Sequence, residues 1–156
     1  MKKTILLFCV ALTNIWLLSG CAVNVPMASE EMDLVAKEFK IPAEGNAGVY
    51  IYRNEFMGAA IKMNIFIDNW LIGSTASKTY HYLELFPGNY TFMGSSENDS
   101  TLNVDVAANK LYYIWQEVKM GIMYARNKLH LVDEFEGQKG VLESKLAISN
   151  SIDKNK

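Results

Sequence analysis

The fold is decided at residues 47–53, which read Ala47-Gly48-Val49-Tyr50-Ile51-Tyr52-Arg53. In this stretch Val49, Ile51 and Arg53 alternate with Tyr50 and Tyr52. A period of two is typical of a β-strand, in which successive side chains point to opposite faces. Aromatic and β-branched residues also favour strands over helices. The stretch therefore opens a predicted β domain, which we place at residues 46–147.

Further strands are predicted downstream of this stretch, at intervals of roughly 8–12 residues. They fall at residues 63–67, 71–73, 80–86, 90–93, 101–106, 111–118 and 129–132. Asp68-Asn69 is a turn sequence, and Pro87-Gly88 favours a type II turn that would pair the strands on either side of it. This spacing predicts a mainly β fold, a small antiparallel β-sandwich of about seven to eight strands.

A short amphipathic helix is predicted before the β domain. Ser29 can cap it, and Pro42 and Gly45 end it. The apolar stripe of this helix consists of Met32, Val35, Ala36 and Phe39. Such a stripe either packs on the domain or lies on a membrane or a partner, although it lacks the basic polar face of a membrane-surface helix.

A second short helix is predicted after the last strand, at residues 133–146. Its apolar contacts are expected to be Phe135, Val141, Leu142 and Leu146. Gly137 and Gly140 weaken the helical pattern, since glycine disfavours a helix interior. Residues 148–156 form a polar tail that we expect to be disordered.

The N-terminus carries an export signal. Lys2 and Lys3 precede an apolar run at residues 5–18, which is shorter than the about 20 residues of a membrane-spanning helix. The run ends in Leu18-Ser19-Gly20-Cys21, which resembles the lipobox of a bacterial lipoprotein. The resemblance implies that residues 1–20 are removed after Gly20, that the Cys21 sulfur carries a diacylglycerol, and that the new amino group can be acylated with palmitate. Residues 21–45 are then a lipidated tether that contains the short helix.

Composition excludes several classes of protein. Loss of Lys2 and Lys3 from 15 basic residues leaves 13 against 17 acidic ones, a net charge of −4. Such a chain has no electrostatic basis for binding nucleic acid or an anionic headgroup cluster. The two cysteines are Cys9, lost with the signal, and Cys21, used for lipid, so neither a disulfide nor a zinc-thiolate site is expected.

Motifs for catalysis and for metal binding are missing from the sequence. His81 and His130 are far apart and belong to predicted strands. Asp99, Thr101, Asn103 and Asp105 alternate like a strand, and Val104 stands where a calcium loop needs glycine. The sequence contains neither the serine-nucleophile motif G-x-S-x-G nor a glycine-rich phosphate-binding loop. We therefore predict no cofactor, no metal and no enzymatic activity.

Several sequence blocks match a known family in order. They include residues 49–53, 58–62, 87–91, 97–99, 112–113, 115–121, 131–134, 136–137 and 142–146. Together they resemble a mainly proteobacterial lipoprotein family catalogued as domain of unknown function 2846. The spacing of Ile67-Asp68, Ile72-Gly73 and Pro87-Gly88 is also similar to PEGA-type and other prealbumin-like modules. The resemblance implies an outer-membrane or periplasmic lipoprotein with a small β-sandwich, and it transfers no catalytic residue.

Polar residues inside these blocks are candidates for a rim that binds a partner protein or a glycan. They are Arg53, Lys62, Glu97, Asp99, Gln116, Glu117 and Lys119. The alternative is that they are ordinary solvated side chains of strands and loops.

The leading functional hypothesis is a lipid-anchored interaction or envelope-structural module at the periplasmic face of the outer membrane. By resemblance to enterobacterial sorting, Ala22 rather than Asp after Cys21 favours the outer membrane over the inner one. Display on the cell surface is a further alternative. A third is an enzyme acting on envelope glycan or peptide through Glu97, Asp99 or Glu117, which would need two carboxylates about 5–9.5 Å apart in one cleft.

Overall fold

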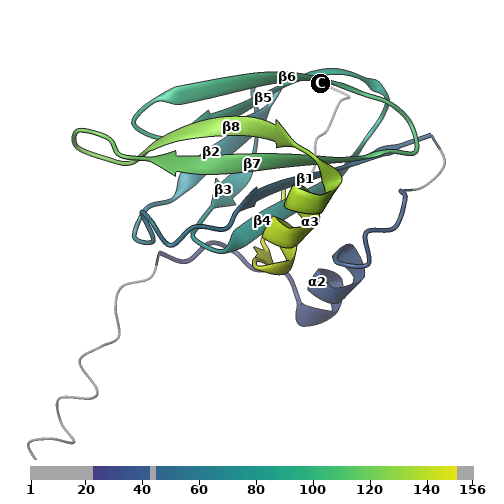
Figure 1. The fold of residues 1–156 in the computed structure, drawn as a ribbon, viewed down its shortest axis with the longest axis horizontal. Helices are drawn as coiled ribbons and strands as arrows, with labels where there is room; N and C mark the ends of the chain where they lie inside the picture. Colours follow the sequence, from purple (N-terminus) through teal and green to yellow (C-terminus); the bar gives the residue numbers. More distant parts are fainter. Residues whose placement is uncertain (1–22, 43–44, 151–156) are drawn as a thin grey trace, which may run out of the picture.

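The computed structural model describes residues 23–42 and 45–150, and within them nine strands form two sheets with two helices (Figure 1). The five-stranded sheet has the order β8-β7-β1-β4-β9 and the four-stranded sheet the order β3-β2-β5-β6. The predicted mainly β fold with two packed sheets is therefore confirmed.

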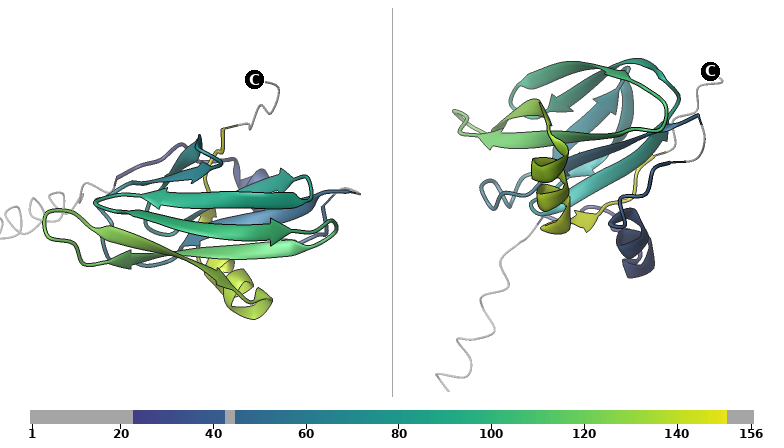
Figure 2. Two further views of the ribbon diagram at one scale, coloured as in Figure 1. Left: turned by 90° about the horizontal axis from the view of Figure 1, so that it is seen from above. Right: turned by 45° about the vertical axis from the view of Figure 1, so that its right-hand side comes forward.

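The bounds of the elements are as follows. The five-stranded sheet consists of β1 (Ala47–Arg53), β4 (Thr79–Leu85), β7 (Leu111–Lys119), β8 (Arg126–Val132) and β9 (Lys145–Leu146). The four-stranded sheet consists of β2 (Met63–Ile67), β3 (Trp70–Thr75), β5 (Gly88–Ser95) and β6 (Asp99–Val106). The helices are α2 (Glu30–Ala36) and α3 (Glu134–Leu142), and both lie on the outer face of the five-stranded sheet (Figure 2).

The turn between β2 and β3 is the one that the sequence predicts. Asp68 and Asn69 have φ angles of 49° and 69°. Two successive left-handed residues are typical of the two-residue turn that matches the twist of a β-hairpin, and Asn and Asp tolerate this conformation better than most residues.

The prediction of a type II turn at Pro87-Gly88 is wrong. Gly88 has a φ of 156°, far from the roughly +80° of that turn. The strands on either side do not pair, because β4 belongs to one sheet and β5 to the other. Leu85 and Tyr90 both reach the core between the sheets. The chain therefore crosses from sheet to sheet here instead of folding back on itself.

The five-stranded sheet is mixed, whereas the sequence predicts an antiparallel sandwich. β1 pairs in parallel with β7, and β4 pairs in parallel with β9. The four-stranded sheet is antiparallel throughout. Parallel neighbours need a long crossover. Between β1 and β7 the crossover contains β4 and the whole four-stranded sheet. Side-chain alternation does not encode such a connection.

Both faces of β1 are buried. Val49 and Ile51 join the core between the two sheets, while Tyr50 and Tyr52 belong to a second cluster under the helices. Aromatic rings dominate this second cluster, and the rings of Tyr50 and Tyr113 stack at 5.2 Å. The period of two predicted at residues 47–53 thus separates two different cores.

Helix α2 is shorter than predicted, because it ends at Ala36 with Lys37 as its C-cap instead of reaching Pro42. Ser29 is the N-cap, as predicted, and its hydroxyl accepts the N–H of Met32. Of the predicted stripe, Ala36 is buried, whereas Met32 and Val35 are more than half exposed. A helix of two turns covers only part of the sheet with its last turn, so its remaining apolar side chains stay accessible.

Helix α3 packs through its glycines. A Cβ at Gly140 would lie 2.0 Å from the Tyr52 ring, and one at Gly137 would lie 2.2 Å from the Tyr113 ring. Val141 is buried as predicted. Leu146 is also buried, but it lies in β9, because α3 ends at Leu142 and not at residue 146 as predicted. The predicted contacts of Phe135 and Leu142 are wrong, since both side chains are exposed. The two glycines allow the helix to approach the rings of Tyr52 and Tyr113 closely. The glycine face of α3, and not its large apolar side chains, therefore sets the orientation of the helix.

The segments that flank the sandwich are attached to it. Val25 is buried against Ala76 and Ala147. The N–H of Ile148 donates to the carbonyl of Pro26 at 2.8 Å, and that of Asn150 donates to Ile72 at 2.7 Å. Residues 25–42 are thus part of the domain surface rather than a free tether, and residues 148–150 are bonded rather than loose, because both segments cover sheet edges.

The predicted signal peptide, its cleavage site at Gly20 and the lipidated Cys21 lie outside the described residues. Among the residues that the structure describes, no helix is long and apolar enough to cross a bilayer.

Candidate functional site

The fold separates the seven polar residues predicted to form one rim. Arg53 and Gln116 are fully buried. The other five are at or near the surface: Lys62, Glu97, Asp99, Glu117 and Lys119.

Arg53 holds a loop together from the inside. Its guanidinium donates from Nη1 to the carbonyl of Ile61 at 2.8 Å. From Nη2 it donates to the carbonyls of Met57 at 3.0 Å and Gly58 at 2.6 Å. Arg53 shares the inward-facing side of β1 with Val49 and Ile51, so alternation places it in the interior. It is therefore a structural residue of the 54–62 loop and not a binding residue.

Gln116 belongs to a buried polar chain between the sheets. Its Oε1 accepts the hydroxyl of Thr75 at 2.5 Å, and its Nε2 donates to Oδ1 of Asn127 at 3.3 Å. Asn127 in turn donates to the carbonyl of Gly94 at 3.1 Å. Buried polar groups need such partners to offset their lost hydration. Gln116 therefore links β7 to the opposite sheet and has no access to a ligand.

Glu97 fixes the tip of the β7–β8 hairpin. Its carboxylate accepts the N–H groups of Ile122 at 3.0 Å, Met123 at 2.9 Å and Tyr124 at 2.7 Å. Arg126 Nε also donates to it at 2.9 Å. The backbone N–H groups of Tyr124, Ile122 and Met123 lower the pKa of Glu97 to about 2. A general acid needs the opposite shift, so this carboxylate is suited to holding a loop.

Glu117 lies on the outer face of β7, where Lys119 and His130 contact its carboxylate. Lys119 Nζ donates to Oε1 at 2.5 Å, and His130 Nε2 lies 2.8 Å from Oε2. Hydrogen bonds from Lys119 and His130 lower the pKa of Glu117. The His130 ring also stacks on Trp115 at 5.2 Å. The carboxylates named as candidate acids therefore include two whose pKa values are lowered rather than raised.

Neither histidine belongs to a metal centre within the described residues. His81 is fully buried, with Nδ1 3.0 Å from the Ser149 hydroxyl and Nε2 3.1 Å from the Ser74 carbonyl. Burial lowers the pKa of His81, because the interior disfavours the charged ring. Among residues 23–42 and 45–150, no three His, Cys, Asp or Glu side chains gather closely enough to bind a metal ion.

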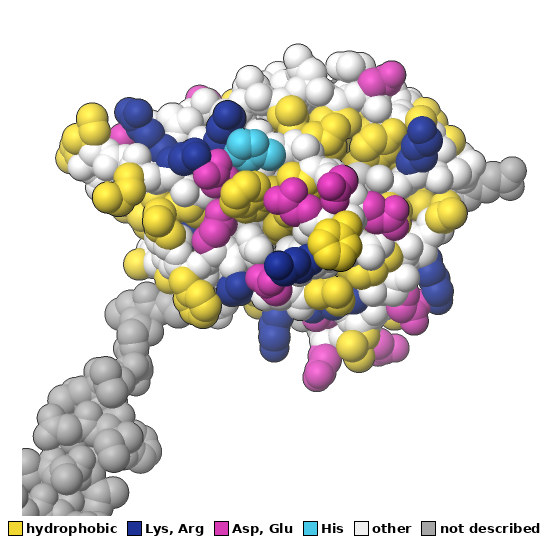
Figure 3. Space-filling view, in the orientation of Figure 1, with side chains coloured by type: hydrophobic (Ala, Val, Ile, Leu, Met, Phe, Trp, Pro, Cys, Tyr) yellow, Lys and Arg dark blue, Asp and Glu magenta, His cyan; other side chains and the backbone are white. Residues whose placement is uncertain are grey.

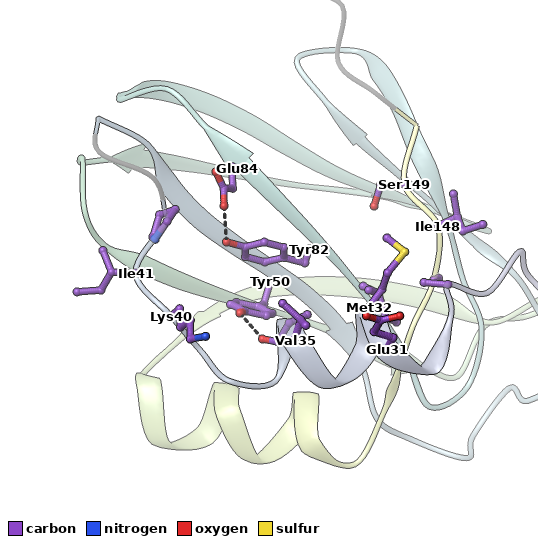
Figure 4. A pocket seen from close by; sticks show the side chains of 15 residues that line it. Glu31, Met32, Val35, Lys40, Ile41, Tyr50, Tyr82, Glu84, Ile148 and Ser149 are labelled. Atoms are coloured by element: carbon purple, nitrogen blue, oxygen red, sulfur yellow. Dashed lines mark hydrogen bonds between the residues drawn. The ribbon is translucent and has the colours of Figure 1, made fainter.

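A groove of about 650 Å³ lies between helix α2 and the outer face of β1 and β4 (Figure 4). Its lining is mainly apolar and comes from both ends of the described chain. Apolar walls are contributed by Ala28, Met32, Val35, Ile41, Pro42, Tyr50, Tyr82 and Ile148, and charged side chains by Glu31, Lys40 and Glu84.

Asp33 fastens α2 beside the groove. Its Oδ1 accepts the Tyr80 hydroxyl at 2.8 Å and the N–H of Leu146 at 2.9 Å, and its Oδ2 accepts Lys37 Nζ at 2.8 Å. Burial acts to raise the pKa of Asp33, but these hydrogen bonds outweigh it, and the net pKa is lowered. The helix is thereby fixed in a position that leaves Met32 and Val35 facing the groove.

The floor of the groove is aromatic. The rings of Tyr50 and Tyr82 lie 4.6 Å apart. The Tyr50 hydroxyl donates to the carbonyl of Ala36 at 2.7 Å, and the Tyr82 hydroxyl donates to Glu84 Oε1 at 3.2 Å. Tyr82 therefore offers a flat ring face with its polar end already satisfied, which suits an apolar ligand.

An incomplete strand edge runs beside this floor. In the described residues β9 pairs only with Thr79 and Tyr80, so β4 has no neighbour on that side from His81 to Leu85. The carbonyl of Tyr80 accepts the N–H of Ala147 on the β9 side. Since backbone groups alternate along an antiparallel strand, those of Tyr82 and Glu84 point to the same open edge.

Sequence reasoning missed this groove. Met32 and Val35 could have indicated it in part, because an apolar stripe on a short helix can remain exposed. Tyr82 could not, since an aromatic residue in a strand is typical of a core. The open edge of β4 depends on where the C-terminal segment turns away, which no local pattern records.

The family described as "Protein of unknown function (DUF2846)" matches residues 43–127. A protein of Haemophilus influenzae (strain ATCC 51907 / DSM 11121 / KW20 / Rd), described as uncharacterized, is 38% identical over 135 residues, which cover 86% of this chain and 80% of the relative. The chain belongs to the DUF2846 family. No solved structure matches it.

The DUF2846 match divides the molecule unequally. Residues 43–127 include β1 to β7, the 54–62 loop and the tip of the β7–β8 hairpin. Both charged side chains that hold these loops, Arg53 and Glu97, lie inside the match. Helix α2 and helix α3 lie outside it, so one wall of the groove is built from the part of the chain that the family description does not cover.

Proposed function

We propose that this protein is a lipid-anchored interaction module of the bacterial envelope, non-enzymatic, with its domain at the periplasmic face of the outer membrane. The anchor is the lipid on Cys21, inferred from the lipobox-like sequence. The binding site is the groove between α2 and the β1–β4 face. The single observation that carries the proposal is this apolar groove beside an open strand edge.

The occupant that fits the groove best is an extended apolar segment of another envelope protein. The free backbone groups of Tyr82 and Glu84 can pair with such a segment as an added strand, the mode of recognition known as β-augmentation. Side chains of the added strand that point toward α2 would contact Met32, Val35 and the Tyr82 ring. Glycan is disfavoured because the lining offers few free polar groups.

The anchor is tested by Cys21→Ala. Without the sulfur there is no site for the diacylglycerol, and two or more acyl chains are what makes such binding firm. We expect the variant to move from the membrane to the soluble fraction and to lose lipid labelling. Unchanged fractionation would refute the anchor.

The groove is tested by a photoreactive amino acid placed at Val35 or at Leu34 in the native host. Both side chains are on α2 and are about equally exposed, at 58% and 62%, but only Val35 lines the groove. Crosslinks from position 35 to one apolar segment of an envelope protein, absent from position 34, would support the proposal. A synthetic peptide of that segment should then protect the amides of Tyr82 and Glu84 from hydrogen exchange.

Equal crosslinking at positions 34 and 35 would contradict a specific groove. Crosslinks from position 35 to lipid or glycan alone would show that the groove takes a different ligand, and would equally contradict the proposal.

A further inference from the structure

Six large apolar side chains are exposed at one end of the sandwich. They are Phe56, Met57, Met120, Ile122, Met123 and Tyr124, each between 55% and 91% exposed. Two come from the 54–62 loop and four from the β7–β8 hairpin, and we call them the apolar end. In Figure 3 hydrophobic side chains gather at the left, where the hairpin projects, with Lys and Arg side chains beside them. Contiguous exposed apolar surface on a soluble domain marks a contact site.

The hairpin tip is held rigidly in this exposed position. The Glu97 carboxylate binds three successive backbone N–H groups of the tip, as described above. A Cβ at Gly121 would lie 1.6 Å from the carbonyl oxygen of Tyr124, so only glycine fits this turn. The tip is therefore built to present Ile122 and Met123 to the outside, and does not expose them through loose packing.

The two loops form one surface. A Cβ at Gly58 would lie 3.4 Å from Val118 and 3.6 Å from Ala125, so the 54–62 loop contacts the base of the hairpin. The acidic groups at this base are paired, Glu97 with Arg126 and Glu117 with Lys119. Each of these two carboxylates is therefore neutralised by its cation, so neither opposes the approach of a membrane surface.

The described chain starts at the same end. Val23, Asn24 and Val25 line a small cavity together with Lys78, and Lys78 Nζ lies 5.5 Å from the centre of the Phe56 ring. Figures 1 and 2 place the purple start of the described chain and the hairpin tip at one end of the molecule. Val25 is buried, and the four residue steps from Cys21 to Val25 span at most about 14 Å.

We propose that the apolar end is a bilayer-contacting surface, which inserts its six side chains into the interface of the phospholipid leaflet that carries the Cys21 lipid. This inference rests on the anchor in the proposed function, because the anchor brings this end within reach of the bilayer. The lipid keeps the protein on the membrane, and the apolar end sets the orientation of the domain. Tyr124 and the flanking Lys119 and Arg126 are residue types that favour the headgroup region.

This orientation has a consequence for the groove. β1 and β7 run in parallel toward the apolar end, while β4 runs away from it and ends at Leu85. The groove extends along β4 toward that far end through Tyr82 and Glu84. A domain seated on its apolar end thus leaves the groove open to the periplasm.

The test uses the full mature lipoprotein reconstituted in vesicles of phosphatidylethanolamine and phosphatidylglycerol. Met123→Cys and Phe86→Cys each receive an environment-sensitive NBD label. Phe86 is the matched control, because it is also well exposed but follows β4 at the opposite end of the sandwich. Cys21 does not compete for the label when it is lipidated.

We expect the label at position 123 to shift to the blue and to be quenched by nitroxide-bearing lipids, while the label at position 86 stays accessible to iodide in water. Equal accessibility to iodide at both positions, in protein that remains on the vesicles, would overturn this inference and leave the anchor intact. Protein that leaves the vesicles altogether would overturn the anchor and this inference together. Shielding of position 123 only after a second protein is added would also overturn it, in favour of a protein contact.

Discussion

The two loops of the apolar end are held by charges of opposite sign. Arg53 reaches the 54–62 loop from the interior and donates to three carbonyls. Glu97 reaches the hairpin tip from a partly exposed position and accepts three N–H groups. A cation can satisfy only backbone acceptors and a carboxylate only donors, so each loop is folded to turn the matching groups inward. Arg53 is fully buried, so losing its hydrogen bonds should destabilise the whole domain. Glu97 is partly exposed, so losing its hydrogen bonds should loosen only the hairpin tip.

The largest expected effect is that of Arg53→Met. The substitution keeps most of the apolar stem but leaves three carbonyls of the 54–62 loop without their donor. Because an unsatisfied buried acceptor costs about 1–3 kcal/mol, we expect a loss of about 2–4 kcal/mol in the free energy of unfolding, measured by urea denaturation.

The control for this measurement is Lys62→Met, which removes a cation from the exposed side of the same loop. Exposed substitutions usually change stability by less than about 0.5 kcal/mol. Equal losses in the two variants would show that Arg53 acts only through net charge.

Gly121→Ala should have an intermediate effect. The added Cβ would collide with the Tyr124 carbonyl oxygen, so the turn must open and the N–H groups must leave Glu97. Overpacking of this kind costs about 1–3 kcal/mol. Faster hydrogen exchange at the amides of residues 122–124, with β1 and β4 unaffected, is the expected result. Unchanged exchange at these amides would mean that Glu97 does not hold the tip.

The smallest expected effect is a local change at acidic pH, and it should occur in the β7–β8 hairpin but not in the 54–62 loop. The pKa of Glu97 falls from 4.5 to about 2 on folding, because the N–H groups of Tyr124, Ile122 and Met123 favour its charged form. Its contribution is therefore complete above pH 4.5 and is lost as the pH falls toward about 2. Amide chemical shifts of residues 122–124 should move over that window. The 54–62 loop should show no such transition, since the Arg53 guanidinium remains protonated. A midpoint near 4.5 at the hairpin amides would contradict the account.

The sequence predicts the local elements better than their partners. Val49 and Tyr50 alternate, and they do enter two different cores; Asp68-Asn69 is a turn because both residues tolerate positive φ. Pro87-Gly88 was misleading, because a chain that crosses between sheets also needs a bend, and the dipeptide does not specify which strand comes next. The parallel pairing of β1 with β7 escapes prediction for the same reason.

The candidate site shows the same limit. Arg53 and Gln116 are polar residues in strands, which single-sequence reasoning assigns to the surface. Gln116 is buried because it bonds to Thr75 and Asn127 on other strands. Arg53 is buried because the loop that follows β1 folds around its guanidinium. Conversely, Met32 and Val35 look like core residues and are exposed, because the two-turn helix α2 leaves them over a groove. The partners of Gln116 and the shape of the groove both depend on tertiary neighbours, which local sequence does not record.

The central claim is that Cys21 carries the lipid that places this domain on a membrane. Mass spectrometry of the N-terminal peptide from protein purified from its native host tests it most directly. We expect a chain that begins at residue 21 with a mass increased by a diacylglycerol, and by a further acyl group if the amine is modified. A free thiol at Cys21, or a peptide that still contains residues 1–20, would contradict the account.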